Sequence, residues 1–165
     1  MAAELENTIY LDLAQGRVVV ALRPDLAPAH CAQIKALVRR GFYDGLAFHR
    51  VIPGFMAQTG DPLGNGTGGS GNRLQAEFSA AKHVRGTLSM ARAADPHSAD
   101  SQFFIMFAPA PHLDGQYTVW GEVVSGMEFV DAIKQGDPAR NGSVAQPDRI
   151  VTMRVAADIG TAAAP

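Results

Sequence analysis

The sequence contains five histidines and one cysteine, residue types that often bind metals or take part in nucleophilic catalysis. They are His30, Cys31, His49, His83, His97 and His112. No two histidines are three or four residues apart, and Cys31 has no second cysteine at zinc-site spacing or for an internal disulfide. The pattern therefore predicts neither a metal centre nor a disulfide framework.

Serine, histidine and aspartate are all present, so a hydrolase has to be considered. The G-x-S-x-G turn that presents a nucleophilic serine is absent, because Ser70 and Ser125 have different flanking residues. A catalytic triad is defined by its geometry rather than by its order in the chain. A hydrolase therefore stays open as an alternative.

A glycine-rich stretch at 60–71 contains a formal G-x-G-x-x-G at Gly64, Gly66 and Gly69. A dinucleotide site needs a strand before this motif, a helix after it and an acidic residue about 20 positions later. Residues 72–75 show no helical apolar period, and no Gly-Lys-Ser or Gly-Lys-Thr of a P-loop is present. The stretch predicts a turn-rich surface loop, and no cofactor is expected.

An arginine stands among large apolar residues in segment 42–60. If this part is a strand, alternation places Phe48 and Arg50 on one face and His49 and Val51 on the other. A buried, unpaired guanidinium is strongly unfavourable. Arg50 must therefore reach solvent, pair with a carboxylate or serve a site.

The elements that position these residues are short and rich in turns. The chain has 165 residues, 47% of them hydrophobic, with 17 glycines and 10 prolines, which predicts one folded domain. The formal net charge of −2 argues against a nucleic-acid partner, since phosphate contact favours a basic stripe. The N-terminus lacks a signal-peptide pattern and no apolar run reaches a membrane-spanning length, so we expect a soluble, cytoplasmic protein without a membrane partner.

Alternation and turn residues predict eight strands, and helical periodicity predicts two helices. The expected strands are 8–12, 17–22, 46–51, 55–59, 87–91, 102–106, 118–123 and 150–156. The expected helices run from about 28 to 40 and from about 127 to 135. Many short strands favour a sandwich or barrel, with the helices flanking it.

Four blocks give the sequence a family resemblance. They are FHRVIPGFMAQTGD at 48–61, SMAR at 89–92, SQFFI at 101–105 and HLDGQYTVWG at 112–121. Together they resemble the cyclophilin family of peptidyl-prolyl cis–trans isomerases over roughly residues 8–156, most of all its compact single-domain bacterial members. The resemblance implies a mainly β fold, a closed eight-stranded antiparallel β-barrel capped by two α-helices. It also implies a single domain over 1–165, with a core at about 8–156 and a disordered tail at 160–165.

The resemblance assigns roles to twelve residues of a groove on the outer surface of the barrel. The catalytic group is Arg50, Phe55 and Gln58. The substrate-binding group is His49, Met56, Ala91, Arg92, Gln102, Phe104, His112, Leu113 and Tyr117. Arg50 corresponds to the catalytic arginine, and Gln58 to the residue that orients it and binds the substrate backbone. No metal and no cofactor are implied.

Two residues depart from the pattern of many eukaryotic members. His112 replaces a tryptophan that contacts cyclosporin, so we expect weak cyclosporin binding with prolyl turnover retained. Tyr117 replaces a histidine, and its ring keeps an aromatic wall with a polar tip. The polar loop at 94–100 is expected to influence access to the groove rather than the chemistry.

The expected function is isomerisation of Xaa-Pro bonds in proline-containing peptides and in unfolded or partly folded proteins, by a monomer. The alternative is a non-catalytic proline-recognition or chaperone module that uses the same groove. An intact Arg50 favours the enzyme, because simple binding does not require transition-state stabilisation.

Overall fold

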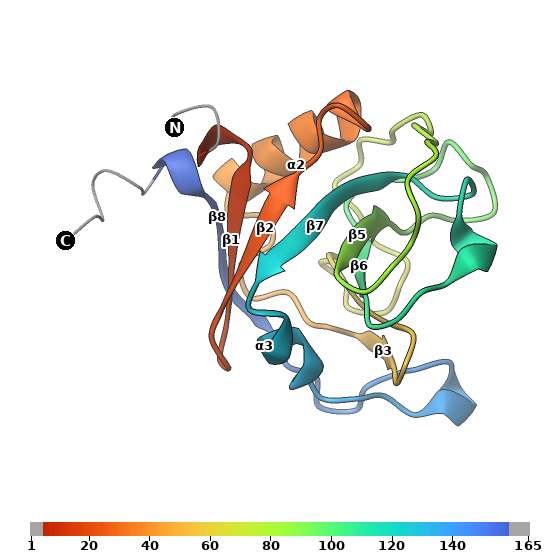
Figure 1. Cartoon of the computed structure of the whole chain (residues 1–165). Coiled ribbons are helices and arrows are strands. Elements are labelled where there is room, and N and C mark those ends of the chain that lie inside the picture. Colours follow the sequence, from red (N-terminus) through yellow and green to blue (C-terminus); the bar gives the residue numbers. More distant parts are fainter. Residues whose placement is uncertain (1–4, 159–165) are drawn as a thin grey trace.

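The computed structural model describes residues 5–158, and the eight predicted strands lie within this range (Figure 1). They are β1 (Thr8–Leu13), β2 (Arg17–Leu22), β3 (Arg50–Ile52), β4 (Met56–Thr59), β5 (Thr87–Met90), β6 (Phe103–Met106), β7 (Val119–Ser125) and β8 (Ile150–Val155). All pairings between them are antiparallel, and β1 and β2 form the hairpin expected around residues 13–16. The expected tail at 160–165 lies outside the described residues.

The strands form one curled sheet in the order β3-β4-β6-β5-β7-β2-β1-β8. The prediction of a closed barrel is wrong, because the end strands β3 and β8 do not pair with each other. Only the segment at 45–48, which precedes β3, meets residues 148–150 at the start of β8, through a bridge between Ala47 and Arg149 and neighbouring backbone hydrogen bonds. The outer edge of β3 pairs instead with the loop at 136–143. The backbone N–H of Val51 donates to the carbonyl oxygen of Gly142, and the carbonyl oxygen of Val51 accepts from Gly136, both at 2.8 Å. This loop occupies the edge that β8 would need to close the barrel.

The register of β3 and β4 determines which side chains face the inside of the curled sheet. Val51 lies opposite Ala57 and both join the main core, whereas Arg50 lies opposite Gln58 outside it. The expectation that Phe48 shares a face with Arg50 is wrong, since Phe48 is fully buried in the main core together with Val51. Residues before β3 are not part of the strand, so its alternation does not extend back to Phe48.

A second apolar cluster covers the outer face of β4 and β6. Its buried members are Met56, Phe104, Met106, Ala110 and Leu113. Every residue of β4 and β6 is therefore buried, in place of the usual pattern of one buried and one exposed face. Burial of a large apolar side chain stabilises a fold by about 1.5–3 kcal/mol, so this outer cluster firmly supports the surface above it.

Two helices lie at opposite ends of the curled sheet, α2 (Pro28–Arg39) near β7 and β8, and α3 (Met127–Asp131) against β2 (Figure 1). The buried face of α2 is the predicted one, with His30 added; it consists of His30, Cys31, Ile34, Leu37 and Val38. The second helix is shorter than the predicted 127–135. The backbone N–H of Lys134 donates to the Asp148 carboxylate at 2.7 Å instead of continuing the helix.

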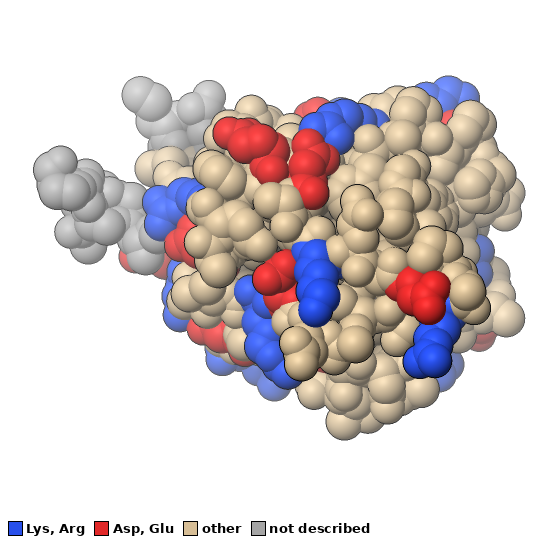
Figure 2. All heavy atoms as spheres, turned by 90° about the horizontal axis from the view of Figure 1, so that it is seen from below, with Lys and Arg blue, Asp and Glu red and all other residues tan. Residues whose placement is uncertain are grey.

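The surface combines charges of both signs. On the face seen from below α3, acidic and basic side chains are interspersed rather than gathered into a stripe of one sign (Figure 2). Within residues 5–158, no helix combines the length and apolar character needed to cross a membrane.

Candidate active site

A cavity of about 300 Å³ opens on the outer face of the sheet, above the second apolar cluster. It is lined by Arg50, Phe55, Met56, Gln58, Ala91, Arg92, Phe104, His112, Leu113 and Tyr117. Strands β3, β4 and β6 supply its floor, and the segments at 91–92 and 112–117 supply its opposite wall. All ten lining residues belong to the twelve that the sequence singled out.

The guanidinium of Arg50 is held in place by three hydrogen bonds. Its Nε donates to the carbonyl oxygen of Asn141 at 2.9 Å, and its Nη2 donates to Oδ1 of the same residue at 3.1 Å. Its Nη1 donates to Oε1 of Gln58, the cross-strand neighbour, at 3.0 Å. A guanidinium has five N–H donors, so two remain for a ligand in the cavity.

The charge of Arg50 is not neutralised by its neighbours. All three acceptors are neutral, and no carboxylate of residues 5–158 forms an ion pair with this guanidinium. Partial burial lowers its pKa from the ordinary value, and Tyr117 acts in the opposite direction. Arginine stays protonated at neutral pH, so the cavity contains a permanent, partly desolvated cation.

A relay of amides connects this arginine to the glycine-rich loop. Gln58 accepts from Arg50, and its Nε2 donates to Oε1 of Gln102 at 2.9 Å. The Nε2 of Gln102 donates in turn to the carbonyl oxygen of Gly68, also at 2.9 Å. Since Gln58 is only 8% exposed, its amide is fixed with the oxygen towards Arg50.

The apolar floor of the cavity has a polar support beneath it. The ring of Phe104 stacks on the ring of His83 at 6.1 Å and meets Tyr117 edge-on at 5.8 Å. His83 Nδ1 lies 3.1 Å from an Asp114 carboxylate oxygen, and Nε2 lies 2.9 Å from the Ser89 hydroxyl. Burial lowers the pKa of His83, and Asp114 opposes that shift.

Ser89, His83 and Asp114 are the residue types of a hydrolase triad, but a substrate cannot reach the serine. Ser89 is fully buried and His83 is 1% exposed, and neither lines the cavity. A serine nucleophile must reach its substrate. The triad-like set therefore supports Phe104 and does not revive the hydrolase alternative.

Comparisons with known proteins identify the family of this chain. The family model described as "Cyclophilin type peptidyl-prolyl cis-trans isomerase/CLD" matches residues 8–155. This chain belongs to the cyclophilin family. A "Probable peptidyl-prolyl cis-trans isomerase" of Brucella suis is 58% identical over 95% of this chain and 86% of its own length. "Peptidyl-prolyl cis-trans isomerase B" of Bacillus subtilis is 46% identical over 79% of this chain and 93% of its own.

Solved cyclophilin structures share the fold. A cyclophilin from Hirschia baltica has a TM-score of 0.84 at 26% identity, covering 94% of this chain and 76% of its own. A cyclophilin type isomerase of Cryptosporidium parvum, determined in the presence of the dipeptide Ala-Pro, has a TM-score of 0.82 at 29% identity. That match covers 90% of this chain and 98% of its own. The activity of this cyclophilin is peptidyl-prolyl cis–trans isomerisation.

The two remaining predicted residues lie beyond the 300 Å³ cavity of this cyclophilin. Gln102 lines a second, adjoining cavity. His49 lines neither cavity and faces the glycine-rich loop, with Nε2 3.9 Å from where a Cβ on Gly66 would stand. Burial lowers the pKa of His49, while nearby Asp61 raises it. Contact of either residue with substrate stays a prediction.

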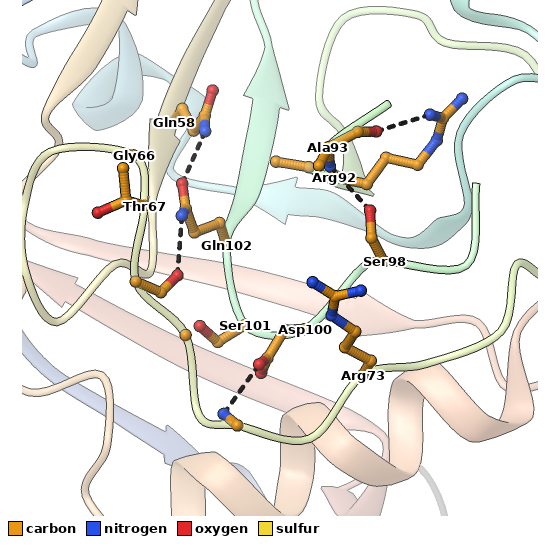
Figure 3. A pocket seen from close by; sticks show the side chains of 14 residues that line it. Gln58, Gly66, Thr67, Arg73, Arg92, Ala93, Ser98, Asp100, Ser101 and Gln102 are labelled. Atoms are coloured by element: carbon orange, nitrogen blue, oxygen red, sulfur yellow. Dashed lines mark hydrogen bonds between the residues drawn. The ribbon is translucent and has the colours of Figure 1, made fainter. Parts of the chain in front are cut away.

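The second cavity has a volume of about 420 Å³ and is lined largely by the glycine-rich loop and the loop at 94–100 (Figure 3). Two carboxylates hold the glycine-rich loop in shape. Asp61 accepts backbone N–H groups of Leu63 and Asn65, and Asp100 accepts those of Gly71 and Asn72. Although burial would raise the pKa of Asp61, hydrogen bonds from the loop backbone lower it below the ordinary value. The glycine-rich stretch thus forms one wall of the second cavity, and hydrogen bonds to the two carboxylates fix its conformation.

Sequence reasoning missed Asn141, which supplies two of the three acceptors for Arg50. Asn141 has a positive φ of 59° in the turn that follows the short 3₁₀ helix η2 (Pro138–Arg140). Asparagine followed by glycine is a turn signal, and asparagine tolerates this conformation. That signal predicts the turn but does not place it beside a residue 91 positions away.

Within the described residues, no group of three or more histidine, cysteine, aspartate or glutamate side chains is arranged to hold a metal ion. Cys31 is buried on the inner face of α2, and burial raises the pKa of its thiol to about 11. The residues that line the groove supply apolar contact, hydrogen bonding and the charge of arginine.

Proposed function

We propose that this cyclophilin catalyses Xaa-Pro rotation by gripping the proline ring in the 300 Å³ cavity and donating a hydrogen bond from Arg50 to the proline nitrogen. The observation that carries the proposal is the position of Arg50. It lies at the rim of an apolar floor with two N–H donors still available and no carboxylate partner among residues 5–158.

The chemistry of the reaction fits these devices. The barrier to rotation about a peptide bond is about 18–20 kcal/mol, because amide resonance must be lost. No covalent bond is broken, so the rotation requires no nucleophile. The twisted amide has a lone pair on nitrogen that the planar forms lack, so a donor at that atom binds the transition state selectively. Lowering the barrier by about 5–7 kcal/mol would accelerate rotation roughly 10⁴–10⁵-fold.

The apolar floor supports the other half of the proposal. Phe104 and Leu113 are almost fully buried beneath the cavity, and the ring of Phe55 lies 5.8 Å from that of His112. A proline ring placed on this floor is removed from water, and its contact with the apolar side chains holds one end of the rotating bond. The carbonyl end is then free to turn.

A charge-conserving substitution tests the donor role. Arg50→Lys keeps the positive charge but loses the planar fork that serves Asn141, Gln58 and a substrate together. We expect kcat/KM on a proline peptide to fall by at least about tenfold, as for loss of an interaction made in the transition state. Arg85→Lys, at a surface ion pair with Asp131, is the matched control. Wild-type activity of Arg50→Lys would overturn the proposal.

Unfolded and partly folded proteins with exposed prolines are the substrates we propose, and the protein acts as a monomer in this proposal. The open groove supports this, because an extended segment of a larger chain can enter it from the surface. A cytoplasmic location also stays a prediction.

A further inference from the structure

Arg92 lines the cavity of about 300 Å³ that we propose for the proline ring, called the proline cavity below, but its guanidinium bonds to the backbone of the protein itself. Its Nη2 and Nε donate to the carbonyl oxygen of Gln116 at 2.7 and 3.2 Å. Its Nη1 donates to the carbonyl oxygen of Ala93 at 2.9 Å (Figure 3) and to that of Ala94 at 3.3 Å. A guanidinium has five N–H donors, so these bonds leave Arg92 one, whereas Arg50 retains two.

The same guanidinium lies over the ring of Tyr117, 4.5 Å from the ring centroid. Tyr117 is half-buried and lines the proline cavity. Its ring meets that of Phe104, the floor of the cavity, edge-on at 5.8 Å, and that of His83 at 6.5 Å. The Tyr117 hydroxyl forms no hydrogen bond with a residue of 5–158, so contact with these three side chains holds the ring in place.

The bond from Arg92 to Gln116 connects two segments that are distant in the sequence. Gln116 directly precedes Tyr117, and its own N–H donates locally, to the carbonyl oxygen of Leu113 at 2.9 Å. Arg92 follows the end of β5 and reaches Gln116 across 24 residues. Its side chain therefore ties the turn at 113–117 to the end of β5, and holds both the backbone before Tyr117 and the ring of Tyr117 itself.

We propose that Arg92 is a positioning residue of the isomerase, whose guanidinium fixes Tyr117 as a wall of the proline cavity and does not itself bind the substrate. The inference rests on the proposed function, since it takes the proline ring to lie beside Tyr117. A guanidinium suits this task, because its edge can donate to carbonyl oxygens while its face covers an aromatic ring. The wall contacts the proline ring in the planar and the twisted states alike. Loss of Arg92 should therefore weaken peptide binding without slowing the rotation of the bound peptide.

A double-mutant cycle tests whether Arg92 acts through Tyr117. Arg92→Gln, Tyr117→Ala and the double variant are compared with the wild type in kcat and KM for an Ala-Pro peptide, at matched folded fraction. We expect Arg92→Gln to raise KM about threefold, the range for a cation over a ring at an exposed site, and to leave kcat within about 1.5-fold of the wild type. In the Tyr117→Ala background the same substitution should change KM by less than about 1.5-fold, because the ring that Arg92 positions is gone.

Arg149→Gln is the matched control. The Nη1 of Arg149 likewise donates to a backbone carbonyl oxygen, that of Gly45 at 3.0 Å, and Arg149 lines neither cavity. This variant should keep the wild-type KM. The Kd of the same peptide, measured by NMR titration, should rise in Arg92→Gln by the same factor as KM.

Three results would overturn the inference. A rise in KM that persists in the Tyr117→Ala background would mean that Arg92 acts on the substrate directly. A wild-type KM for Arg92→Gln would mean that the ring needs no such support, and a loss in kcat at matched folded fraction would place Arg92 in the rotation step. The proposed function fails separately, through wild-type activity of Arg50→Lys, whatever the effect of Arg92→Gln.

Discussion

Removal of one acceptor from Arg50 tests how far activity depends on the orientation of this arginine. Asn141→Gly deletes the Oδ1 that accepts from Nη2 at 3.1 Å, and keeps the backbone carbonyl that accepts from Nε. Glycine also suits the positive φ of 59° at this position. The substitution thus removes one hydrogen bond to a charged group with little change in the backbone.

The size of the effect follows from the exposure of that bond. A hydrogen bond to a charged group contributes about 1.5–3 kcal/mol when buried, and Nη2 to Oδ1 is an exposed contact, so about 1 kcal/mol is expected here. If that energy positions Arg50 for the twisted amide, kcat/KM should fall about fivefold. Stability should fall by at most about 1 kcal/mol, the contribution of the lost bond, since relief of backbone strain offsets the greater freedom of the unfolded chain.

The assay is the relaxation of a cis proline peptide to trans, with urea unfolding measured on the same samples. Ser143→Gly is the matched control, because Ser143 lies in the same loop and its exposed side chain does not bond to Arg50. Wild-type kcat/KM for Asn141→Gly would refute the positioning role. A loss that Ser143→Gly reproduces, or that tracks lower stability, would attribute the effect to loop flexibility instead.

Three further predictions concern the histidines and the floor of the groove. Burial lowers the pKa of His30, His49 and His83 in the folded protein, so below the ordinary value of about 6.5 the unfolded chain binds more protons than the folded one. Stability should therefore fall as the pH is lowered from about 7.5 to about 5.5, and a urea midpoint that rises on acidification would contradict this. His112 stands exposed at the rim of the groove, so the wild type should bind cyclosporin weakly, and His112→Trp should lower the Kd for cyclosporin about tenfold. A fluorescence titration measures both values, and tight binding of cyclosporin by the wild type would contradict this prediction. Phe104→Ala removes the ring that forms the floor of the proline cavity, so we expect a loss of about 3–5 kcal/mol in the free energy of unfolding together with a higher KM. An unchanged KM in a folded sample would exclude Phe104 from the proline pocket.

Local patterns in the sequence predicted the elements but not how the sheet ends. Eight strands were expected and eight occur, because alternation and turn residues are local signals. Closure of the barrel was predicted wrongly, since it depends on the loop at 136–143, which pairs with β3 through Val51. The second helix was predicted too long because Asp148, remote in sequence, captures the N–H of Lys134. Both errors come from long-range competition for backbone hydrogen bonds.

In the candidate site, too, local motifs predicted some residues, whereas contacts between distant segments could not be predicted. Arg50, Phe55 and Gln58 lie within one motif, and the structure brings them together in one cavity. Asn141 was missed because its contact with Arg50 spans 91 residues and involves a turn with no apolar pattern.

The central claim is that Arg50 stabilises the twisted amide rather than merely binding the peptide. The most direct test measures the cis-to-trans relaxation of an Ala-Pro peptide, and its Kd, for wild type and Arg50→Ala at matched folded fraction. The account predicts that wild type accelerates relaxation, and that Arg50→Ala loses at least about tenfold in rate while it still binds the peptide. An Arg50→Ala variant with wild-type acceleration, or a wild type that binds the peptide without accelerating its relaxation, would contradict it.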